Sequence, residues 1–173
     1  NYLGIDASIL PEVVDDCGEL GYTIKELFGA EILIAGDMAD QQSATFAHRV
    51  VEKGMMKCTC GTGAFVDICV GGRFVPAPRG LFPIATYIAG DKSVFQIEGC
   101  VKSAGSVLTW IRDDLKLIGS YAEIEPMALS VPDSNGVFFI PALSGLGAPY
   151  WNAEITGTFT GLSRSTRKAH MVG

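Results

Sequence analysis

The sequence has no long hydrophobic run. Gly, Asp or Lys interrupts each apolar stretch before it reaches the roughly 20 residues that a membrane-spanning helix needs. A membrane span is therefore not expected.

Basic residues are also scarce. The 173 residues include 13 Lys and Arg against 19 Asp and Glu, which gives a formal net charge of −6 at pH 7. Several of the basic residues, such as Arg164, Arg167 and Lys168, stand near the end of the chain. Binding to nucleic-acid phosphates requires a concentrated positive surface, so we expect no nucleic-acid partner.

The cysteines lack the spacing of a metal site. There are five, an odd number, and Cys58 and Cys60 are separated by a single residue. Structural metal sites pair their ligands at wider spacings, whereas free Cys is commonly a small buried side chain. We therefore assign no protein metal ligand and expect a reducing, cytoplasmic location.

Neither end of the sequence has the features expected of a natural protein terminus. The chain opens with Asn1, without an initiator Met or a signal peptide, and a helix begins after Ser165 just before the sequence closes. We expect both ends to be cut from a longer protein.

What is present is typical of a globular α/β protein. Hydrophobic residues make up 48% of the chain, enough for a substantial core. Short apolar or β-rich runs predict strands at 32–35, 55–60, 64–70, 73–75, 84–89, 94–98 and 137–140, the first and last of them buried. Helical spacing predicts helices within 37–52, ending at Gly54, over 101–118 and over 122–130. Hairpins mixed with helices predict a mixed sheet.

Two acids follow the first apolar run. Asp37 and Asp40 stand between the strand predicted at 32–35 and the next helix, a position where α/β proteins often place their sites. A carboxylate there could accept a proton from a substrate hydroxyl, and Gln41 or Gln42 could hold that hydroxyl or a phosphate oxygen. An acid before a helix is also a common N-cap, and on chemistry alone capping is the more frequent role.

A glycine-rich turn, Gly61-Thr62-Gly63, joins two predicted strands. Small residues allow an anion to approach backbone N–H groups, and the Thr62 hydroxyl adds a donor. Hairpin turns use glycine for positive φ in any case, and this simpler explanation is the more common one.

The order and spacing of several motifs resemble glycerol kinases of the FGGY carbohydrate kinase family. The motifs are Ala39-Asp40-Gln41-Gln42, Gly61-Thr62-Gly63-Ala64-Phe65, Glu98-Gly99 with Ala104-Gly105 and Trp110-Ile111-Arg112-Asp113, and the run from Pro141 to Trp151. Similarity before and after these motifs extends the resemblance over essentially all 173 residues. Any one motif could arise by chance, but the series is highly specific.

The resemblance implies an actin-like, ribonuclease H-like ATPase fold, in which two α/β domains close over a cleft for ATP and substrate. Residues 1–53 would finish the first domain and residues 54–173 would begin the second. The implied reaction transfers the γ-phosphoryl group of Mg²⁺-bound ATP to glycerol, giving glycerol 3-phosphate and ADP. Glycerol and ATP are the expected ligands, and a homo-oligomer of the whole protein stays open.

The resemblance also implies roles for single residues. Asp40 would be the catalytic base, Gln41 would neighbour the substrate, and Phe65 would pack on the carbon skeleton of glycerol. Here Ala39 replaces the usual Gly of the motif. Asp37 is the second choice for the base or a metal-facing acid.

The nucleotide-binding residues implied by the resemblance lie in two segments. Gly61, Thr62 and Gly63 would meet the ATP phosphates, while Gly105 and Thr109 would lie beside the nucleotide. Thr109 stands where many glycerol kinases have Gln. The family's N-terminal phosphate loop, its Arg–Glu pair for glycerol and its C-terminal adenosine segment have no counterpart in these residues, so we expect the chain alone to be inactive.

Three alternatives remain at this point. A kinase for xylulose, ribulose or gluconate would share the fold and the phosphate machinery. A non-catalytic, actin-like or chaperone-type ATPase would share the architecture alone. A degenerate paralogue acting only as a non-catalytic, actin-like binding module is the third, because Ala39 and Thr109 depart from the family pattern.

Overall fold

The computed structural model describes residues 4–173, which form two compact units. Unit 1 comprises the residues up to Met55 together with Ile68–Val75 and Pro83–Gln96. Unit 2 comprises Met56–Asp67, Pro76–Phe82 and Ile97–Gly173. The domain boundary expected between residues 53 and 54 stays a prediction.

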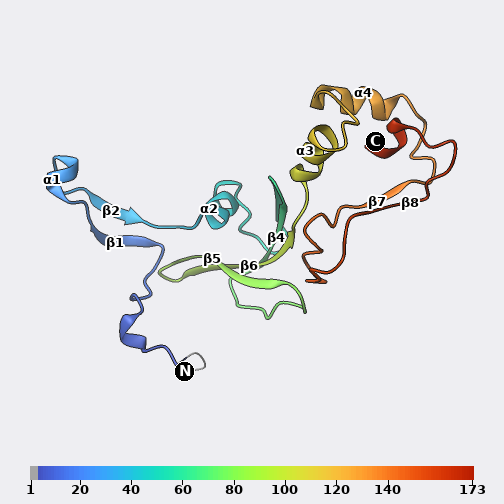
Figure 1. The fold of residues 1–173 in the computed structure, drawn as a ribbon. Coiled ribbons are helices and arrows are strands. Elements are labelled where there is room, and N and C mark those ends of the chain that lie inside the picture. Colours follow the sequence, from blue (N-terminus) through green and yellow to red (C-terminus); the bar gives the residue numbers. More distant parts are fainter. Residues whose placement is uncertain (1–3) are drawn as a thin grey trace. The chain divides into compact units, whose positions relative to one another are not determined.

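Figure 1 shows the path of the chain through its strands and helices, among which β3, β4, β5 and β6 follow one another without a helix between them. The strands are β1 (Cys17–Tyr22), β2 (Leu33–Gly36), β3 (Met56–Cys60), β4 (Ala64–Gly71), β5 (Phe82–Ala89), β6 (Lys92–Val101), β7 (Phe138–Ile140) and β8 (Thr158–Thr160). The helices are α1 (Lys25–Phe28), α2 (Asp40–Ala47), α3 (Gly105–Asp113), α4 (Ile124–Leu129) and α5 (Lys168–Val172), with 3-10 turns at Ala7–Ile9 and Tyr121–Glu123. No helix among residues 4–173 has the length and apolar character to cross a membrane.

Hairpins build the largest sheet, whose strand order is β3-β4-β6-β5. The Gly61–Gly63 turn connects β3 to β4, as the sequence predicts, and a tight turn at Gly90, with φ 61°, connects β5 to β6. The strand predicted at 73–75 is not formed, because the chain leaves the sheet after Gly71. The strands predicted at 84–89 and 94–98 are present and longer than expected.

In unit 1, β1 and β2 form an antiparallel ribbon with α1 at its tip (Figure 1). The run at 32–35 is extended as predicted, but the expectation that it is buried is wrong. Ile32, Leu33 and Ile34 are 52%, 45% and 43% exposed. The reason is that β1 is the sole partner of β2 among residues 4–173, and a two-stranded ribbon has no second layer of its own to cover its apolar side chains.

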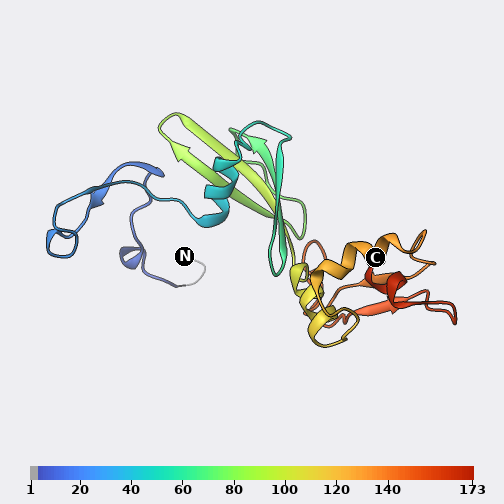
Figure 2. The same cartoon turned by 90° about the horizontal axis from the view of Figure 1, so that it is seen from above.

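Helix α2 is shorter than predicted. It ends at Ala47, and Arg49 then adopts a left-handed φ of 56°, which turns Val50 into a core with Cys69 and Val94. Gly54 does not end the helix; its N–H donates to Cys69 O at 2.9 Å. Figure 2 shows α2 beside the sheet, where its Phe46 ring meets Tyr87 edge-on at 5.3 Å.

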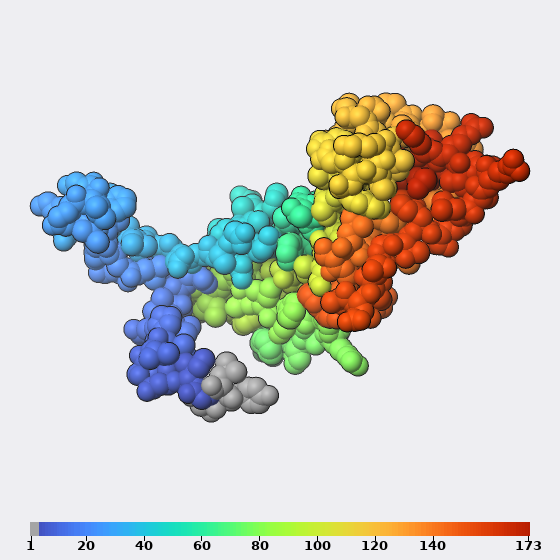
Figure 3. All heavy atoms as spheres, in the orientation of Figure 1, coloured from blue at the N-terminus to red at the C-terminus, as the bar shows by residue number. Residues whose placement is uncertain are grey.

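In unit 2, α3 covers only the middle of the predicted 101–118 helix. Val101 belongs to β6, and a left-handed φ of 54° at Lys116 follows the helix end. Trp110 of α3 stacks on Phe139 of β7 at 5.8 Å, and Phe139 stacks on Phe159 of β8 at 4.2 Å. Figure 3 shows the α3, α4 and α5 residues packed in one mass.

The C-terminal half matches the remaining predictions in part. The short helix near 122–130 and the helix after Ser165 are confirmed, although Arg167 rather than a Ser precedes α5, and its N–H donates to His170 Nδ1 at 2.9 Å. The strand at 137–140 is confirmed as β7, but Phe138 is 68% exposed, so it is not wholly buried. Strands β1 and β8 and helix α1 were not predicted.

Candidate functional site

The Gly61–Gly63 turn is held by close backbone contacts. Gly61 N–H donates to Gly63 O at 2.8 Å, and neither glycine has a positive φ. A Cβ on Gly63 would lie 2.5 Å from Val101 O, which real side chains do not tolerate. Steric room therefore explains glycine at position 63, in place of the positive φ that hairpin turns commonly demand.

Helix α3 begins directly against this turn. Gly105 N–H donates to Gly61 O at 2.9 Å, while the N–H groups of Ala104 and Ser106 donate to Thr62 O at 2.9 and 3.1 Å. A Cβ on Gly105 would lie 2.5 Å from Gly61 O, so only glycine permits this approach. The turn and the start of α3 thus form one hydrogen-bonded corner, and these first N–H groups of the helix are already occupied by the turn.

A pocket of about 540 Å³ opens at this corner. Its lining residues are Gly61, Thr62, Gly105, Ser106, Thr109, Trp110 and Asp114. The volume lies within the usual range for small-molecule sites, and the hydroxyl groups of three lining residues can donate to phosphate or sugar oxygens. The pocket therefore fits part of a nucleotide by size and by chemistry.

Four of the expected nucleotide-binding residues meet in this pocket: Gly61, Thr62, Gly105 and Thr109. Gly63 belongs to the turn and faces Val101. Sequence reasoning did not place Ser106, Trp110 or Asp114 at the nucleotide, whereas Trp110 both stacks on Phe139 and lines the pocket. Helical spacing was the available signal, because Ser106 lies three residues before Thr109 and four before Trp110, and residues three or four apart share a helix face. Asp114 follows Trp110 by four residues in the same way.

The Thr109 hydroxyl is hydrogen-bonded to another hydroxyl. Its Oγ1 lies 3.1 Å from the Tyr121 hydroxyl oxygen, and the Arg112 guanidinium lies 4.3 Å from the centre of the Tyr121 ring. Arg112 in turn donates to Asp113 through Nε and Nη2 at 2.6 and 2.7 Å. These hydrogen bonds from Arg112 lower the pKa of the Asp113 carboxyl and raise the pKa of Arg112. Thr109 is thereby tied to a small polar cluster at the edge of the pocket.

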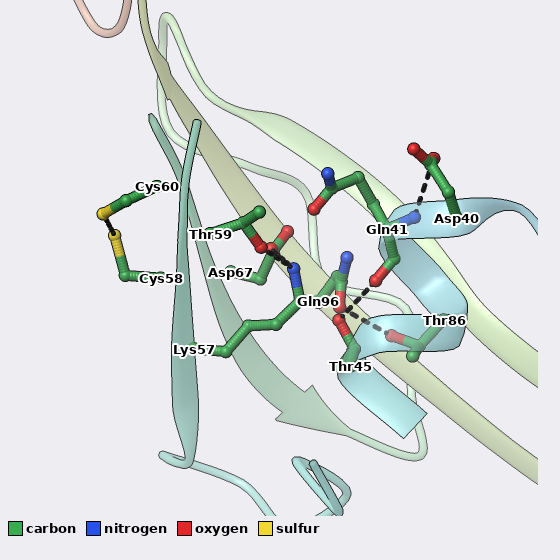
Figure 4. A network of polar contacts seen from close by, with 10 residues as sticks. All are labelled: Asp40, Gln41, Thr45, Lys57, Cys58, Thr59, Cys60, Asp67, Thr86 and Gln96. Carbon is green, nitrogen blue, oxygen red and sulfur yellow. Dashed lines mark hydrogen bonds and ion pairs between the residues drawn. The ribbon is translucent and has the colours of Figure 1, made fainter. Parts of the chain in front are cut away.

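Asp40 is the first residue of α2 in unit 1. Ala39 is the N-cap residue and offers no side-chain acceptor, so Asp40 does not cap the helix from the expected N-cap position. One oxygen, Oδ1, accepts the N–H of Gln41 at 2.8 Å, and the carboxylate is exposed (Figure 4). Thr45, fully buried one turn later, donates to Gln41 O at 2.9 Å and anchors this first turn.

The other expected site residues lie as follows. Phe65 is half-buried on β4 in unit 2. Asp37 in unit 1 is exposed, its N–H donates to Asp16 O at 3.0 Å, and it lines a separate pocket of about 420 Å³ with Asp15 and Asp16. Asp40, the expected base, and the turn expected to meet the phosphates thus belong to different units, and their joint action stays a prediction.

The strand that leads into the turn carries a buried ion pair. Lys57 of β3 contacts Asp67 of β4 at 2.6 Å, with 6% and 0% of their side chains exposed, and Lys57 Nζ also donates to Thr59 at 2.9 Å (Figure 4). Burial, and then the nearby negative charge of Asp67, raise the pKa of Glu98 on β6. No group of three or more His, Cys, Asp or Glu suited to a metal ion occurs among residues 4–173.

Residues 56–173 match the C-terminal domain of the FGGY family of carbohydrate kinases. The chain belongs to this family. FGGY relatives match nearly all of it: a glycerol kinase from Nitrosomonas eutropha is 42% identical over 168 residues, which cover 97% of this chain and 34% of the relative. The chain therefore spans about one third of the length of the curated relatives it matches.

Solved structures of FGGY kinases share the fold. A Plasmodium falciparum glycerol kinase, solved with ADP, has a TM-score of 0.86 and 33% identity, covering 95% of this chain and 33% of that one. A xylulose kinase from Rhodospirillum rubrum has a TM-score of 0.79 at 23% identity, covering 96% of this chain and 34% of that one. The expected α/β, actin-like ATPase fold is confirmed.

Proposed function

We propose that the full-length protein transfers the γ-phosphoryl group of ATP to a terminal hydroxyl of glycerol, giving glycerol 3-phosphate and ADP. The observation that carries this proposal is the pocket at the turn. Gly61, Thr62, Gly105 and Thr109, expected at the nucleotide from sequence resemblance, line a single pocket of suitable size. Curated relatives that cover nearly the whole chain are glycerol kinases.

Thr62 has a defined part in this proposal. Its carbonyl is held by two N–H groups of the α3 start, while its side chain lines the pocket. Phosphoryl transfer passes through a loose transition state, so alignment and charge neutralisation supply most of the rate. We assign the Thr62 hydroxyl to a phosphate oxygen and expect Mg²⁺ to neutralise the phosphates it accompanies.

Asp40 is assigned as the base. Its exposed carboxylate lies at the start of α2, and the buried Thr45 holds the first helical turn in place. One oxygen is oriented by Gln41 N–H, which fixes the direction of the group. A fixed, accessible carboxylate can accept the proton that a substrate hydroxyl loses on attack. Gln41 and Phe65 are assigned to glycerol itself.

The test is a coupled ADP assay on the full-length protein with glycerol and ATP. We expect Asp40→Asn to lower kcat by about 10²–10⁴-fold, the range of general-base contributions, while Asp37→Asn stays within a few-fold of wild type. The two substitutions are matched, because each removes one exposed charge and the two acids are three residues apart, between the end of β2 and the first residue of α2. Loss of rate in Asp37→Asn alone would move the base to that residue.

A substrate panel tests the choice of glycerol. Xylulose, ribulose and gluconate are the competitors, since a xylulose kinase below 25% identity shares the fold. We expect the highest kcat/KM with glycerol, and a higher value for any of the three sugars would assign the protein to that substrate.

The 173-residue chain by itself provides a further comparison. It spans about one third of its relatives, so we expect it to show no turnover with glycerol and ATP in the same assay. ADP formation above the no-glycerol blank would contradict this expectation. Cytoplasmic location is part of the same proposal and is tested by fractionating cells that express the full-length protein.

A further inference from the structure

Two exposed thiols lie in contact on β3, immediately before the glycine turn. Cys58 Sγ and Cys60 Sγ are 3.6 Å apart, and both residues are exposed (Figure 4). Alternate residues of a strand point to the same side, so both thiols occupy one face of β3. None of the nucleotide, substrate or base roles proposed above uses this pair.

The opposite face of β3 prevents the thiols from turning away. Lys57 and Thr59 point to the other side of the strand (Figure 4), where Lys57 pairs with the fully buried Asp67 at 2.6 Å. Turning the cysteine face of the strand inward would pull a buried ammonium from its carboxylate, which is costly. The ion pair therefore keeps both cysteines on the exposed face of β3, where their sulfur atoms are in contact.

The surroundings favour redox chemistry over metal binding. A structural zinc site uses four protein ligands, and no group of three or more suitable side chains exists among the described residues. Two accessible sulfur atoms in contact can instead be joined by a single bond. Cys17 is exposed and Cys69 is buried, which gives an accessible and an inaccessible comparison within the same chain.

We propose that Cys58 and Cys60 form a dithiol that small disulfides, such as glutathione disulfide, oxidise reversibly to an intrachain disulfide. A thiolate of the pair attacks one sulfur of glutathione disulfide, forming a mixed disulfide and releasing one glutathione thiolate. The second thiol loses its proton and attacks the mixed disulfide, releasing the second glutathione. The pair loses two electrons and two protons in total, and one glutathione disulfide is reduced to two thiols.

Either thiol can attack first, because both are exposed and their sulfur atoms are 3.6 Å apart, so each has a resolving partner in contact. The hydrogen bond with Cys60 raises the pKa of the Cys58 thiol.

Strand geometry makes the bond labile. Two strand residues span about 6.6–6.8 Å, at the upper limit of the Cα separation that disulfides tolerate. The disulfide must shorten or twist the end of β3, and a strained disulfide is readily reduced. Because Gly61 follows Cys60 directly, the distortion reaches the turn whose carbonyl accepts the Gly105 N–H. Oxidation should therefore weaken the pocket; this consequence rests on the proposed function, whereas the disulfide itself does not.

The first experiment treats the 173-residue chain with glutathione disulfide and counts free thiols by maleimide labelling, unfolding and intact mass. We expect the label count to fall by two, with Cys58 and Cys60 joined in peptide maps, and to recover with dithiothreitol. Cys17→Ser is the matched control and should still lose two labels. Cys58→Ser and Cys60→Ser should each accumulate a persistent mixed disulfide at the remaining thiol, because neither variant has a resolving partner. Persistent glutathionylation of wild type without ring closure, or no reaction at either thiol, would overturn the proposal.

The second experiment measures kinase rate of the full-length protein before oxidation, after it, and after reduction. A fall of several-fold that dithiothreitol reverses, and that is absent from Cys58→Ser/Cys60→Ser, supports coupling to the turn. An unchanged rate with the disulfide formed overturns the coupling. A protein without kinase activity under any condition refutes the proposed function and leaves the labelling result to stand by itself.

Discussion

Strand β3 and helix α3, which both contact the glycine turn, each carry an ion pair of the same length. One pair is buried and the other is exposed. On β3, Lys57 lies 2.6 Å from Asp67 of β4, and their side chains are 6% and 0% exposed. On α3, Arg112 lies 2.6 Å from Asp113, and their side chains are 33% and 47% exposed. Distance alone therefore does not distinguish them; access to water does.

The difference decides what each pair contributes. A buried charge without its partner keeps the full cost of its desolvation, whereas water replaces the partner of an exposed charge. The Lys57–Asp67 pair thus fixes how β3 meets β4 just before the turn. The Arg112–Asp113 pair instead orients a cation over Tyr121, beyond the helix. We therefore expect substitutions at the Lys57–Asp67 pair to lower the free energy of unfolding far more than substitutions at the Arg112–Asp113 pair.

The largest expected effect is that of Asp67→Ala. This change leaves the Lys57 ammonium buried without its nearest carboxylate, and we expect the free energy of unfolding to fall by about 3 kcal/mol. Urea unfolding of the chain, followed by circular dichroism, measures it. The matched control is Lys57→Met/Asp67→Leu, which removes both charges and should recover most of the loss. A double variant as unstable as the single one would show that packing, not charge, holds these strands.

The next largest effect is expected where the start of α3 contacts the Gly61–Gly63 turn. Gly105→Ala places a Cβ 2.5 Å from Gly61 O, so the turn or the helix must move, and we expect a loss of about 1–3 kcal/mol in the free energy of unfolding. In Gly61→Ala the nearest atom to the new Cβ is 3.9 Å away, at ordinary contact distance, so this variant is the control. Equal urea midpoints for the two variants would refute steric selection of glycine at position 105.

The hairpin and its pocket were accessible to sequence reasoning. Gly61-Thr62-Gly63 between two β-rich runs predicted β3 and β4, and the resemblance to FGGY kinases named Gly61, Thr62, Gly105 and Thr109, which line one pocket. The buried ion pair also left a signal that was not used. Lys57 and Asp67 are equidistant along the chain from Thr62, and a hairpin centred there places opposite charges across from each other.

Other features depend on tertiary context. The spacing of Val101 places it on the apolar face of the predicted helix, but in the structure it is the last residue of strand β6. Lys116 and Arg49 follow the ends of α3 and α2 and adopt left-handed φ values. Lys and Arg rarely adopt positive φ, so the sequence did not predict where these helices end. Burial of the 32–35 run could not be predicted either, because it depends on whether a second layer covers the strand.

A smaller, pH-dependent effect is expected at Glu98, beside the buried pair. Burial and the charge of Asp67 raise the pKa of Glu98 above 4.5 in the folded state, so over this interval the folded state binds more protons than the unfolded state. Stability from this group is fully present below pH 4.5 and is lost as the pH rises through the folded-state pKa. We expect Glu98→Gln to flatten the fall of the urea midpoint as the pH rises above 4.5. Parallel profiles for wild type and variant would contradict this.

The smallest effect is expected at the exposed pair. The hydrogen bond from Arg112 lowers the pKa of Asp113, so its contribution is present above the unfolded-state pKa and is lost as the pH falls through the folded-state value. Water and salt screen both groups, so Asp113→Asn should leave the urea midpoint at pH 7 unchanged, and raising the salt concentration should not separate the two proteins. A loss of unfolding free energy comparable to that of Asp67→Ala would mean that the guanidinium over Tyr121 anchors α3. The contrast between the buried and the exposed ion pair would then be wrong.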